Sequence, residues 1–132
     1  MERTLCIIKP DAFKYGYVSG IEAEIKNAGF NVVKSLEKRL SEQEAREFYA
    51  EHGSRSFFPS LVNYMTSGSV LICVLEHVDG IKKFRELMGA TNPIDAKDGT
   101  IRKKYGTSID ENAIHGSDSK DAAQREIKFF FG

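Results

Sequence analysis

The chain has 132 residues, of which 41% are hydrophobic and 29% are charged, a balance typical of one folded domain rather than a disordered or fibrous chain. Nineteen Lys and Arg residues balance nineteen Asp and Glu residues, so no net electrostatic field favours nucleic acid or an anionic membrane as a partner. We therefore predict a single domain, residues 1–132, that builds any anion-binding site from local groups.

The first part of the chain alternates strand and helix patterns. The continuous apolar run Thr4–Ile8 (TLCII) predicts a strand that is covered on both faces. Ser19 and Glu22 have the spacing of a capping box, which predicts a helix that ends at Gly29. Phe30–Leu40 follows with apolar residues on even positions, the period of a half-covered strand.

The middle of the chain repeats this alternation. Ser41 and Glu44 form a second capping-box pattern and predict a helix that ends at Gly53. After a further helical insert, the run Val70–Leu75 (VLICVL) predicts another strand covered on both faces. A third helix is predicted over Asp79–Met88.

The last part of the chain begins with a long connection between Gly89 and Glu111, in which no period is evident. Loops of this length in compact domains are usually functional or disordered. A short strand at Ala113–His115 and a final helix over Ser119–Phe131 follow. This order corresponds to two split βαβ units, so we predict an α+β, ferredoxin-like sandwich with a four-stranded, mostly antiparallel sheet and helices on one face.

The cysteines and the N-terminal segment indicate the cellular compartment in which the protein is located. Cys6 and Cys73 each lie within an apolar run and have no C-x-x-C spacing, so we expect reduced core cysteines. The segment MERTLCIIKPD has no basic stretch followed by a long apolar one, and no run approaches the ~18 apolar residues of a membrane span. We expect a cytoplasmic protein.

Common catalytic and nucleotide-binding motifs are absent. The sequence contains no G-x-x-x-x-G-K-[ST], G-x-G-x-x-G, H-E-x-x-H or G-x-S-x-G. A nucleotide site in this chain would therefore be built without a P-loop or a Rossmann turn.

Glu126 occupies an unusual position on the final helix. It shares a helical face with Ala123, Ile127 and Phe130, so the pattern places a carboxylate within the apolar arc. A buried carboxylate is costly unless another group hydrogen-bonds to it. His115 and Ser117 are the nearest candidates in the sequence, but helical spacing alone leaves open that Glu126 reaches water from the helix edge.

His115 can be read as a core histidine or as a nucleophile. A neutral imidazole can attack with one nitrogen when a hydrogen bond holds the other, and Glu126 could supply that bond directly or through Ser117. Gly116 is interpreted as leaving room for a bulky group to approach. This arrangement suits nucleophilic catalysis through a covalent intermediate.

Several cationic and polar residues could form a phosphate site. Lys9 ends an apolar strand, and Arg85 lies between Phe84 and Leu87. The long connection contributes Thr91, Asn92 and Arg102. Singly, each charge is more typical of a solvated surface; together they provide the fixed cations that stabilise charge in phosphoryl transfer.

These residues lie in ordered blocks that resemble the nucleoside diphosphate kinase family from Arg3 to Phe131. In chain order the blocks are IIKPDA (7–12), FYAEH (48–52), FFPSLV (57–62), RELMGATNP (85–93), GTIR (99–102) and SIDENAIHGSDS (108–119). The last block is the most specific, because an asparagine and two apolar residues lead directly into H-G-S-D.

The resemblance implies transfer of the γ-phosphoryl group from a nucleoside triphosphate to a nucleoside diphosphate by a ping-pong route through phosphohistidine. It implies that His115 is the nucleophile and that Glu126 and Ser117 orient it. Further matched positions contact phosphates or sugar, or support those contacts: Lys9, Tyr49, Arg85, Thr91, Arg102 and Asn112.

The resemblance also describes the base site, the metal and the assembly. Phe57 matches the aromatic residue on which the base stacks, and Leu61 and Ile109 match residues that line the base site. Stacking on an aromatic ring accepts any base, so broad base tolerance is expected. Mg²⁺ would be held mainly by the nucleotide's phosphates, without a protein metal cage. The family forms homo-oligomers, and we expect a tetramer or a hexamer.

Two other function classes are less well supported. A nucleotide-binding module without turnover would not need a nucleophile held by a carboxylate. An RNA-binding domain of ferredoxin-like fold would be expected to carry a K/R-G-F/Y-G/A-F-V run, which is absent. His52 and His77 are interpreted as surface or helix-end residues without a catalytic role.

Overall fold

A four-stranded antiparallel sheet in the order β2-β3-β1-β4 forms the centre of the molecule in the computed structural model, which describes residues 1–132. The strands are β1 (Glu2–Ile8), β2 (Asn31–Arg39), β3 (Ser69–His77) and β4 (Ile114–Gly116). All three pairings are antiparallel. The predicted ferredoxin-like α+β architecture is confirmed.

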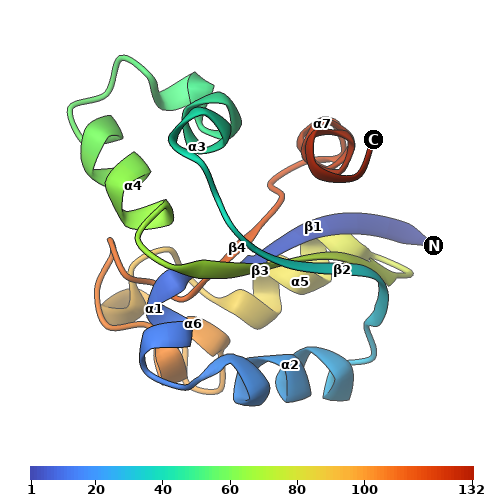
Figure 1. The fold of residues 1–132 in the computed structure, drawn as a ribbon. Helices are drawn as coiled ribbons and strands as arrows, with labels where there is room; N and C mark the ends of the chain where they lie inside the picture. The colour runs from blue at the N-terminus through green and yellow to red at the C-terminus, as the bar shows by residue number, and fades with distance from the viewer.

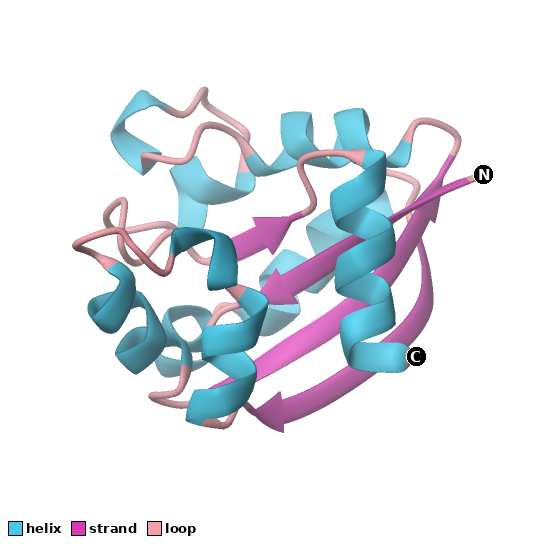
Figure 2. Cartoon of the chain, turned by 90° about the horizontal axis from the view of Figure 1, so that it is seen from above, coloured by secondary structure: helices cyan, strands magenta, loops and turns pink.

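Seven α-helices and two 3₁₀ turns connect and follow the strands (Figures 1 and 2). The helices are α1 (Pro10–Lys14), α2 (Val18–Asn27), α3 (Glu42–Phe48), α4 (Phe58–Met65), α5 (Gly80–Met88), α6 (Ile101–Tyr105) and α7 (Lys120–Phe131). The 3₁₀ turns are η1 (Ala50–His52) and η2 (Pro93–Asp95). No helix is both long and apolar enough to cross a bilayer.

Helices cover both faces of the sheet, so the prediction of helices on one face was wrong. Cys6 and Ile8 of β1 pack into one core cluster with residues of α2, α5 and α6. Leu5 and Ile7 pack into a second cluster with residues of α3, α4 and α7. Figure 1 shows these two groups of helices on opposite sides of the sheet. The continuous apolar run in β1 already required two covered faces.

Strand β2 is more exposed than its alternating pattern indicated. It lies at one edge of the sheet, and Val32, Val33 and Leu36 are 37–40% exposed. Only the residues that flank the strand, Phe30 and Leu40, are buried. The sheet therefore has one long edge with apolar side chains at the surface.

Two of the predicted helix starts are confirmed and one is wrong. Ser41 Oγ accepts the Glu44 N–H at 3.1 Å, and Glu44 Oε1 accepts the Ser41 N–H at 3.0 Å, so α3 begins with a complete capping box. Ser119 caps α7 by accepting the Ala122 N–H. Ser19 caps nothing, because α2 already begins at Val18 without a side-chain cap.

Three other features differ from the prediction. The helix that starts after Ser41 ends at Phe48, and a separate 3₁₀ turn covers Ala50–His52 before Gly53. The connection between Gly89 and Glu111 is not structureless, since it contains η2 and α6. The short strand lies one residue later than predicted, over Ile114–Gly116.

The cysteines face each other across two neighbouring strands. Cys6 of β1 is the register partner of Cys73 of β3, and both are free and buried. Burial raises the pKa of each thiol, most strongly that of Cys6. Both cysteines are therefore free core residues, as predicted.

Candidate active site

His115 and Glu126 are in direct contact. His115 lies in the middle of β4, and its Nε2 is 2.9 Å from Glu126 Oε1 of α7. Figure 2 shows α7 lying across the strands on this face of the sheet. Glu126 is only 7% exposed, so it does not reach water from the helix edge. The structure therefore selects the buried, directly bonded arrangement from the alternatives that the sequence left open.

The hydrogen-bond chain behind His115 assigns its protons. Leu5 N–H donates to Ser117 Oγ at 3.1 Å, so the Ser117 hydroxyl hydrogen is free to be donated to Glu126 Oε1 at 2.8 Å. The same carboxylate oxygen accepts from His115 Nε2. In the neutral imidazole, this arrangement places the hydrogen on Nε2 and leaves the lone pair of Nδ1 free.

An aromatic ring holds the imidazole from the side. Phe48 at the end of α3 packs edge-on against His115 with ring centroids 5.4 Å apart, and Phe48 packs in turn on Phe130 of α7. The His115 side chain remains 19% exposed. The ring is thus fixed on one side and open to solvent on another.

Gly116 has a different role from the one interpreted from the sequence. A Cβ atom at this position would lie 2.7 Å from both Met88 Cε and Phe84 Cδ2. Gly116 is therefore required by core packing against α5 and not by the approach of a substrate. The interpretation was wrong because neighbouring residues of a strand point to opposite faces, so Gly116 faces away from His115.

Lys9, Asn112 and Thr91 are joined by hydrogen bonds. Lys9 Nζ donates to Asn112 Oδ1 at 2.9 Å, and Asn112 Nδ2 donates to the Thr91 carbonyl at 3.0 Å. Lys9 and Asn112 are both buried. Burial, together with the nearby Arg102 charge, lowers the pKa of Lys9 to about 8, although Asp11 opposes this shift.

Arg102 is held beside the strand that carries His115. Its Nη2 donates to the Ile114 carbonyl at 2.7 Å and its Nη1 to the Gly89 carbonyl at 3.1 Å, while its buried Nε has no partner. Burial and the Arg85 charge lower the pKa of Arg102 to about 10. The buried Arg102 therefore lies between two like charges, the buried Lys9 and the exposed Arg85, and a bound anion would relieve this repulsion.

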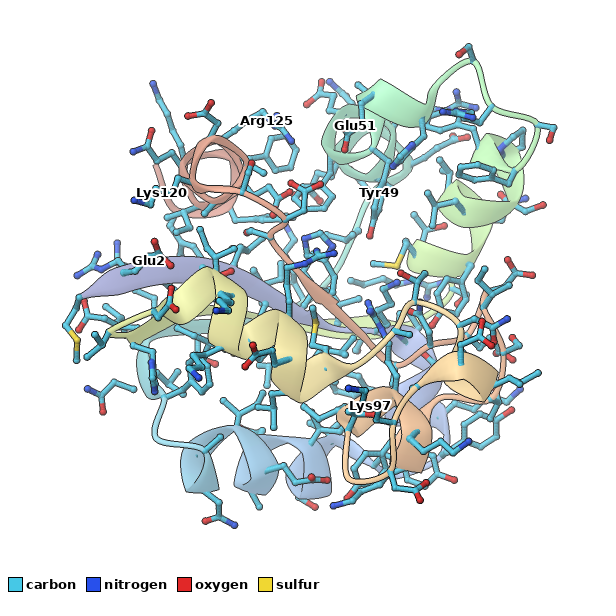
Figure 3. The ribbon with its side chains drawn as sticks, turned by 180° about the vertical axis from the view of Figure 1, so that it is seen from behind. Glu2, Tyr49, Glu51, Lys97, Lys120 and Arg125 are labelled. Atoms are coloured by element: carbon cyan, nitrogen blue, oxygen red, sulfur yellow. The ribbon has the colours of Figure 1, made fainter.

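Tyr49 has a hydroxyl that donates to no group of the protein. Its hydroxyl is buried and has no hydrogen-bond partner. Burial, with the Glu126 charge as a smaller contribution, raises the pKa of Tyr49, so the hydroxyl stays protonated. Figure 3 shows Tyr49 pointing from the end of α3 toward the middle of the molecule, on the side facing the loop of Lys97. A buried O–H without a partner is a donor available to a ligand.

The predicted base-site residues form one end of a cleft of roughly 560 Å³. Phe57 is 46% exposed and Ile109 is 55% exposed, and both line this cleft with Leu61. Lys9, Thr91 and Asn112 line the same cleft. Arg85 and Arg102 line a neighbouring hollow of roughly 820 Å³, which shares Thr91 with the cleft. Apolar and cationic groups therefore adjoin along one continuous surface.

His52 lies at the end of η1 and is partly exposed, as expected of a helix-end residue. Its ring lies 6.5 Å from that of Tyr49 in a stacked arrangement and 5.5 Å from that of Phe57. His52 thus packs between two of the predicted site residues. Tyr49 and His52 are three residues apart in FYAEH, a spacing that places both on one face of a helical segment.

A family model described as nucleoside diphosphate kinase matches residues 2–132. The chain belongs to this family. It is 50% identical to the nucleoside diphosphate kinase of Rickettsia prowazekii and 51% identical to that of Halorhodospira halophila. Each match covers 99% of this chain, and 94% and 93% of those proteins.

Solved structures of nucleoside diphosphate kinases have the same fold. The Aquifex aeolicus structure matches with a TM-score of 0.97 and 42% identity, over 99% of this chain and 95% of that one. A Halobacterium salinarum structure, solved in complex with CDP, matches with a TM-score of 0.95 and 42% identity, over 98% and 87% of the chains. The chain is therefore an enzyme of the nucleoside diphosphate kinase class, a phosphotransferase.

Proposed function

We propose that this nucleoside diphosphate kinase transfers the γ-phosphoryl group of a nucleoside triphosphate to a nucleoside diphosphate through His115. Nδ1 attacks the γ-phosphorus, the bond to the bridging oxygen breaks, and the nucleoside diphosphate leaves with that electron pair. A second nucleoside diphosphate then attacks with a phosphate oxygen, and the P–N bond returns its pair to Nδ1. The observation that supports this proposal is the hydrogen-bond chain that leaves Nδ1 unprotonated.

The positively charged groups bind and stabilise the phosphates in this proposal. Arg102 is close enough to Lys9 to lower the pKa of Lys9, and Arg85 is close enough to Arg102 to lower the pKa of Arg102. Phosphoryl transfer is catalysed largely by positioning and by such fixed charges. Asn112 holds Lys9 in place, and the free Tyr49 hydroxyl is a donor for a phosphate oxygen. Glu126 and Ser117 orient the imidazole.

Mg²⁺ is proposed as the cofactor that accompanies the nucleotide. No group of three or more His, Cys, Asp or Glu side chains is arranged to enclose a metal, whereas Mg²⁺ commonly binds through substrate phosphates and retained waters. The residues present fit a metal delivered on the phosphates, which Lys9, Arg85 and Arg102 would hold. When bound, the metal neutralises phosphate charge.

The experiment that tests the proposal measures the intact mass of the protein after incubation with Mg–ATP. One acid-labile phosphoryl group should appear, and it should disappear when a nucleoside diphosphate is added. A nucleotide-binding module without turnover would gain no mass. Absence of the phosphoenzyme would overturn the proposal.

Phe57→Ala is expected to weaken binding of all nucleoside diphosphates by a similar factor. The ring is half exposed at the cleft, and stacking is worth about 1–3 kcal/mol for any base because every base has a π-face. Calorimetric titration with diphosphates of a purine and of a pyrimidine measures this. A loss confined to one base would contradict the proposed broad base tolerance.

Lys9 is expected to make nucleotide affinity depend on pH in the alkaline range. Because its pKa is lowered to about 8, Lys9 is charged below that pH and neutral above it, and only the charged form attracts phosphate. The Kd for a nucleoside diphosphate should rise about tenfold per pH unit above 8, until Lys9 titrates in the complex.

The matched variant for this titration is Lys9→Met. It should bind more weakly at pH 7 and show no such rise in Kd between pH 8 and 9.5. Calorimetric titration without metal at each pH gives both profiles. Equal pH slopes in the two proteins would assign the dependence to another group.

We also propose a homo-oligomer and a cytoplasmic location. The apolar, exposed edge of β2, with Val32, Val33 and Leu36, supports contacts between copies of the chain. The two buried, free cysteines support a reducing compartment. Sedimentation of the purified chain distinguishes a tetramer, a hexamer and a monomer.

A further inference from the structure

Asp11 is a buried carboxylate that takes no part in the phosphoryl transfer proposed above. It lies in the first turn of α1 and is 2% exposed. Its Oδ2 accepts the Ala113 N–H at 3.1 Å, and its Oδ1 accepts the Tyr64 hydroxyl. Burying a carboxylate this deeply costs free energy unless its oxygens are hydrogen-bonded. Ala113 and Tyr64 supply these hydrogen bonds to Asp11.

Its partner Ala113 has a backbone conformation that few residues other than glycine adopt. The φ angle of Ala113 is +75°, and the Ile114 N–H donates to the Asn112 carbonyl at 2.9 Å. These features define a γ-turn centred on Ala113. Because a γ-turn with positive φ is rare and strained, it persists only where surrounding groups hold it.

Residues 9–11 hydrogen-bond to both backbone polar groups of Ala113, its carbonyl and its N–H. Lys9 N–H donates to the Ala113 carbonyl at 2.9 Å, and Asp11 accepts the Ala113 N–H. The second bond is charge-assisted and therefore the stronger type. Ala113 itself is completely buried, so water cannot replace either partner.

The turn separates the two halves of the phosphate site. On its N-terminal side, Asn112 accepts from the Lys9 ammonium group. On its C-terminal side, the Ile114 carbonyl accepts from Arg102, and His115 follows directly. The angle at Ala113 thus sets where the His115 ring lies relative to Lys9.

We propose that Asp11 is a positioning residue of the phosphoryl transfer, which acts by fixing the γ-turn at Ala113 and thereby the placement of His115. This inference rests on the proposed role of His115. A positioning role differs from a purely structural role in one respect. Loss of the Asp11 charge should slow attack by His115 more than it weakens nucleotide binding.

Asp11→Asn tests this split, because the amide keeps the shape and one acceptor but removes the charge. The rate constant for His115 phosphorylation by Mg–ATP in a single turnover is expected to fall about 10- to 100-fold, with the Kd for ADP changed less than about threefold, since a displacement of about 1 Å can cost about 100-fold. Ile25→Val, a conservative change in the core cluster that also contains Ala113, is the control for general loosening of this core and should leave the rate constant unchanged.

Ala113→Gly tests whether the turn carries the effect. Glycine adopts positive φ without strain, so in this background Asp11→Asn should lower the phosphorylation rate constant much less than in the wild type. If Asp11→Asn alone does not fold, a double variant that folds and is phosphorylated at nearly the rate of Ala113→Gly still supports the role of the turn. A large additional loss in the double variant would overturn the role of the turn.

The outcomes separate the two proposals. A wild-type chain that forms no phosphohistidine overturns the proposed function itself. A wild-type chain that is phosphorylated at the same rate as Asp11→Asn overturns only the positioning role. A Kd that rises as much as the rate constant falls also overturns it, because Asp11 would then act on binding.

Discussion

Replacing His115 by alanine is expected to abolish the phosphoenzyme and to reduce turnover below about 10⁻⁴ of the wild-type value, because no other group can carry the phosphate. Glu126 and Ser117 remain in place but have nothing to orient. Intact mass after incubation with Mg–ATP and steady-state transfer between ATP and a second nucleoside diphosphate measure the two quantities.

The matched control is His77→Ala. His77 lies at the end of β3 beside Phe30 and donates nothing to the cleft. This variant should retain the phosphoenzyme and its acid lability. A phosphoryl group that persists on the His115→Ala chain would place the nucleophile elsewhere and remove the basis of the mechanism.

The fold was predictable where the signal is local. The apolar runs of β1 and β3 predict doubly covered strands because each such residue must be buried on its own face, and the Ser41–Glu44 box needs only four residues. The start of α2 was mispredicted because Ser19 lies inside a helix whose first turn begins at Val18. The five residues of α6 are too few to show a helical period.

The candidate site was predictable in composition but not in geometry. Helical phase placed Glu126 within the apolar arc but left open whether it reaches water, and the structure shows it buried. Whether it reaches His115 directly depends on how α7 lies over β4, a long-range packing relation that no local pattern contains. The catalytic and binding roles assigned from the family resemblance stay predictions until the variants are measured.

Asp11 shows why part of the site was missed. Its position in IIKPDA gives no indication of a partner, since Ala113 lies 102 positions later in the chain. The positive φ of Ala113 is equally hidden, because alanine does not mark such a turn in the way that glycine does. Only the antiparallel pairing of β1 with β4 brings the two segments together.

Glu126→Gln is expected to slow His115 phosphorylation on the order of 10²- to 10⁴-fold. The amide has nearly the same shape as the carboxylate but no charge, so it cannot stabilise the positive charge that develops on the imidazole as Nδ1 attacks. If the amide turns its NH₂ group toward His115, Nε2 must accept, and the hydrogen moves to Nδ1, which then has no lone pair. Single-turnover phosphorylation by Mg–ATP measures the rate constant.

Glu47→Gln, on the exposed side of α3, makes the same chemical change away from the site and should leave the rate constant unaltered. Nitrogen NMR of the His115 ring distinguishes loss of the Glu126 charge from loss of the Nδ1 lone pair. If phosphorylation is slow and the tautomer is unchanged, the loss of charge is the cause. If the hydrogen is on Nδ1, the loss of the lone pair is the cause. A wild-type rate in Glu126→Gln would mean that the 2.9 Å contact contributes to packing only. The reactivity of His115 would then depend on the phosphate-binding cations alone.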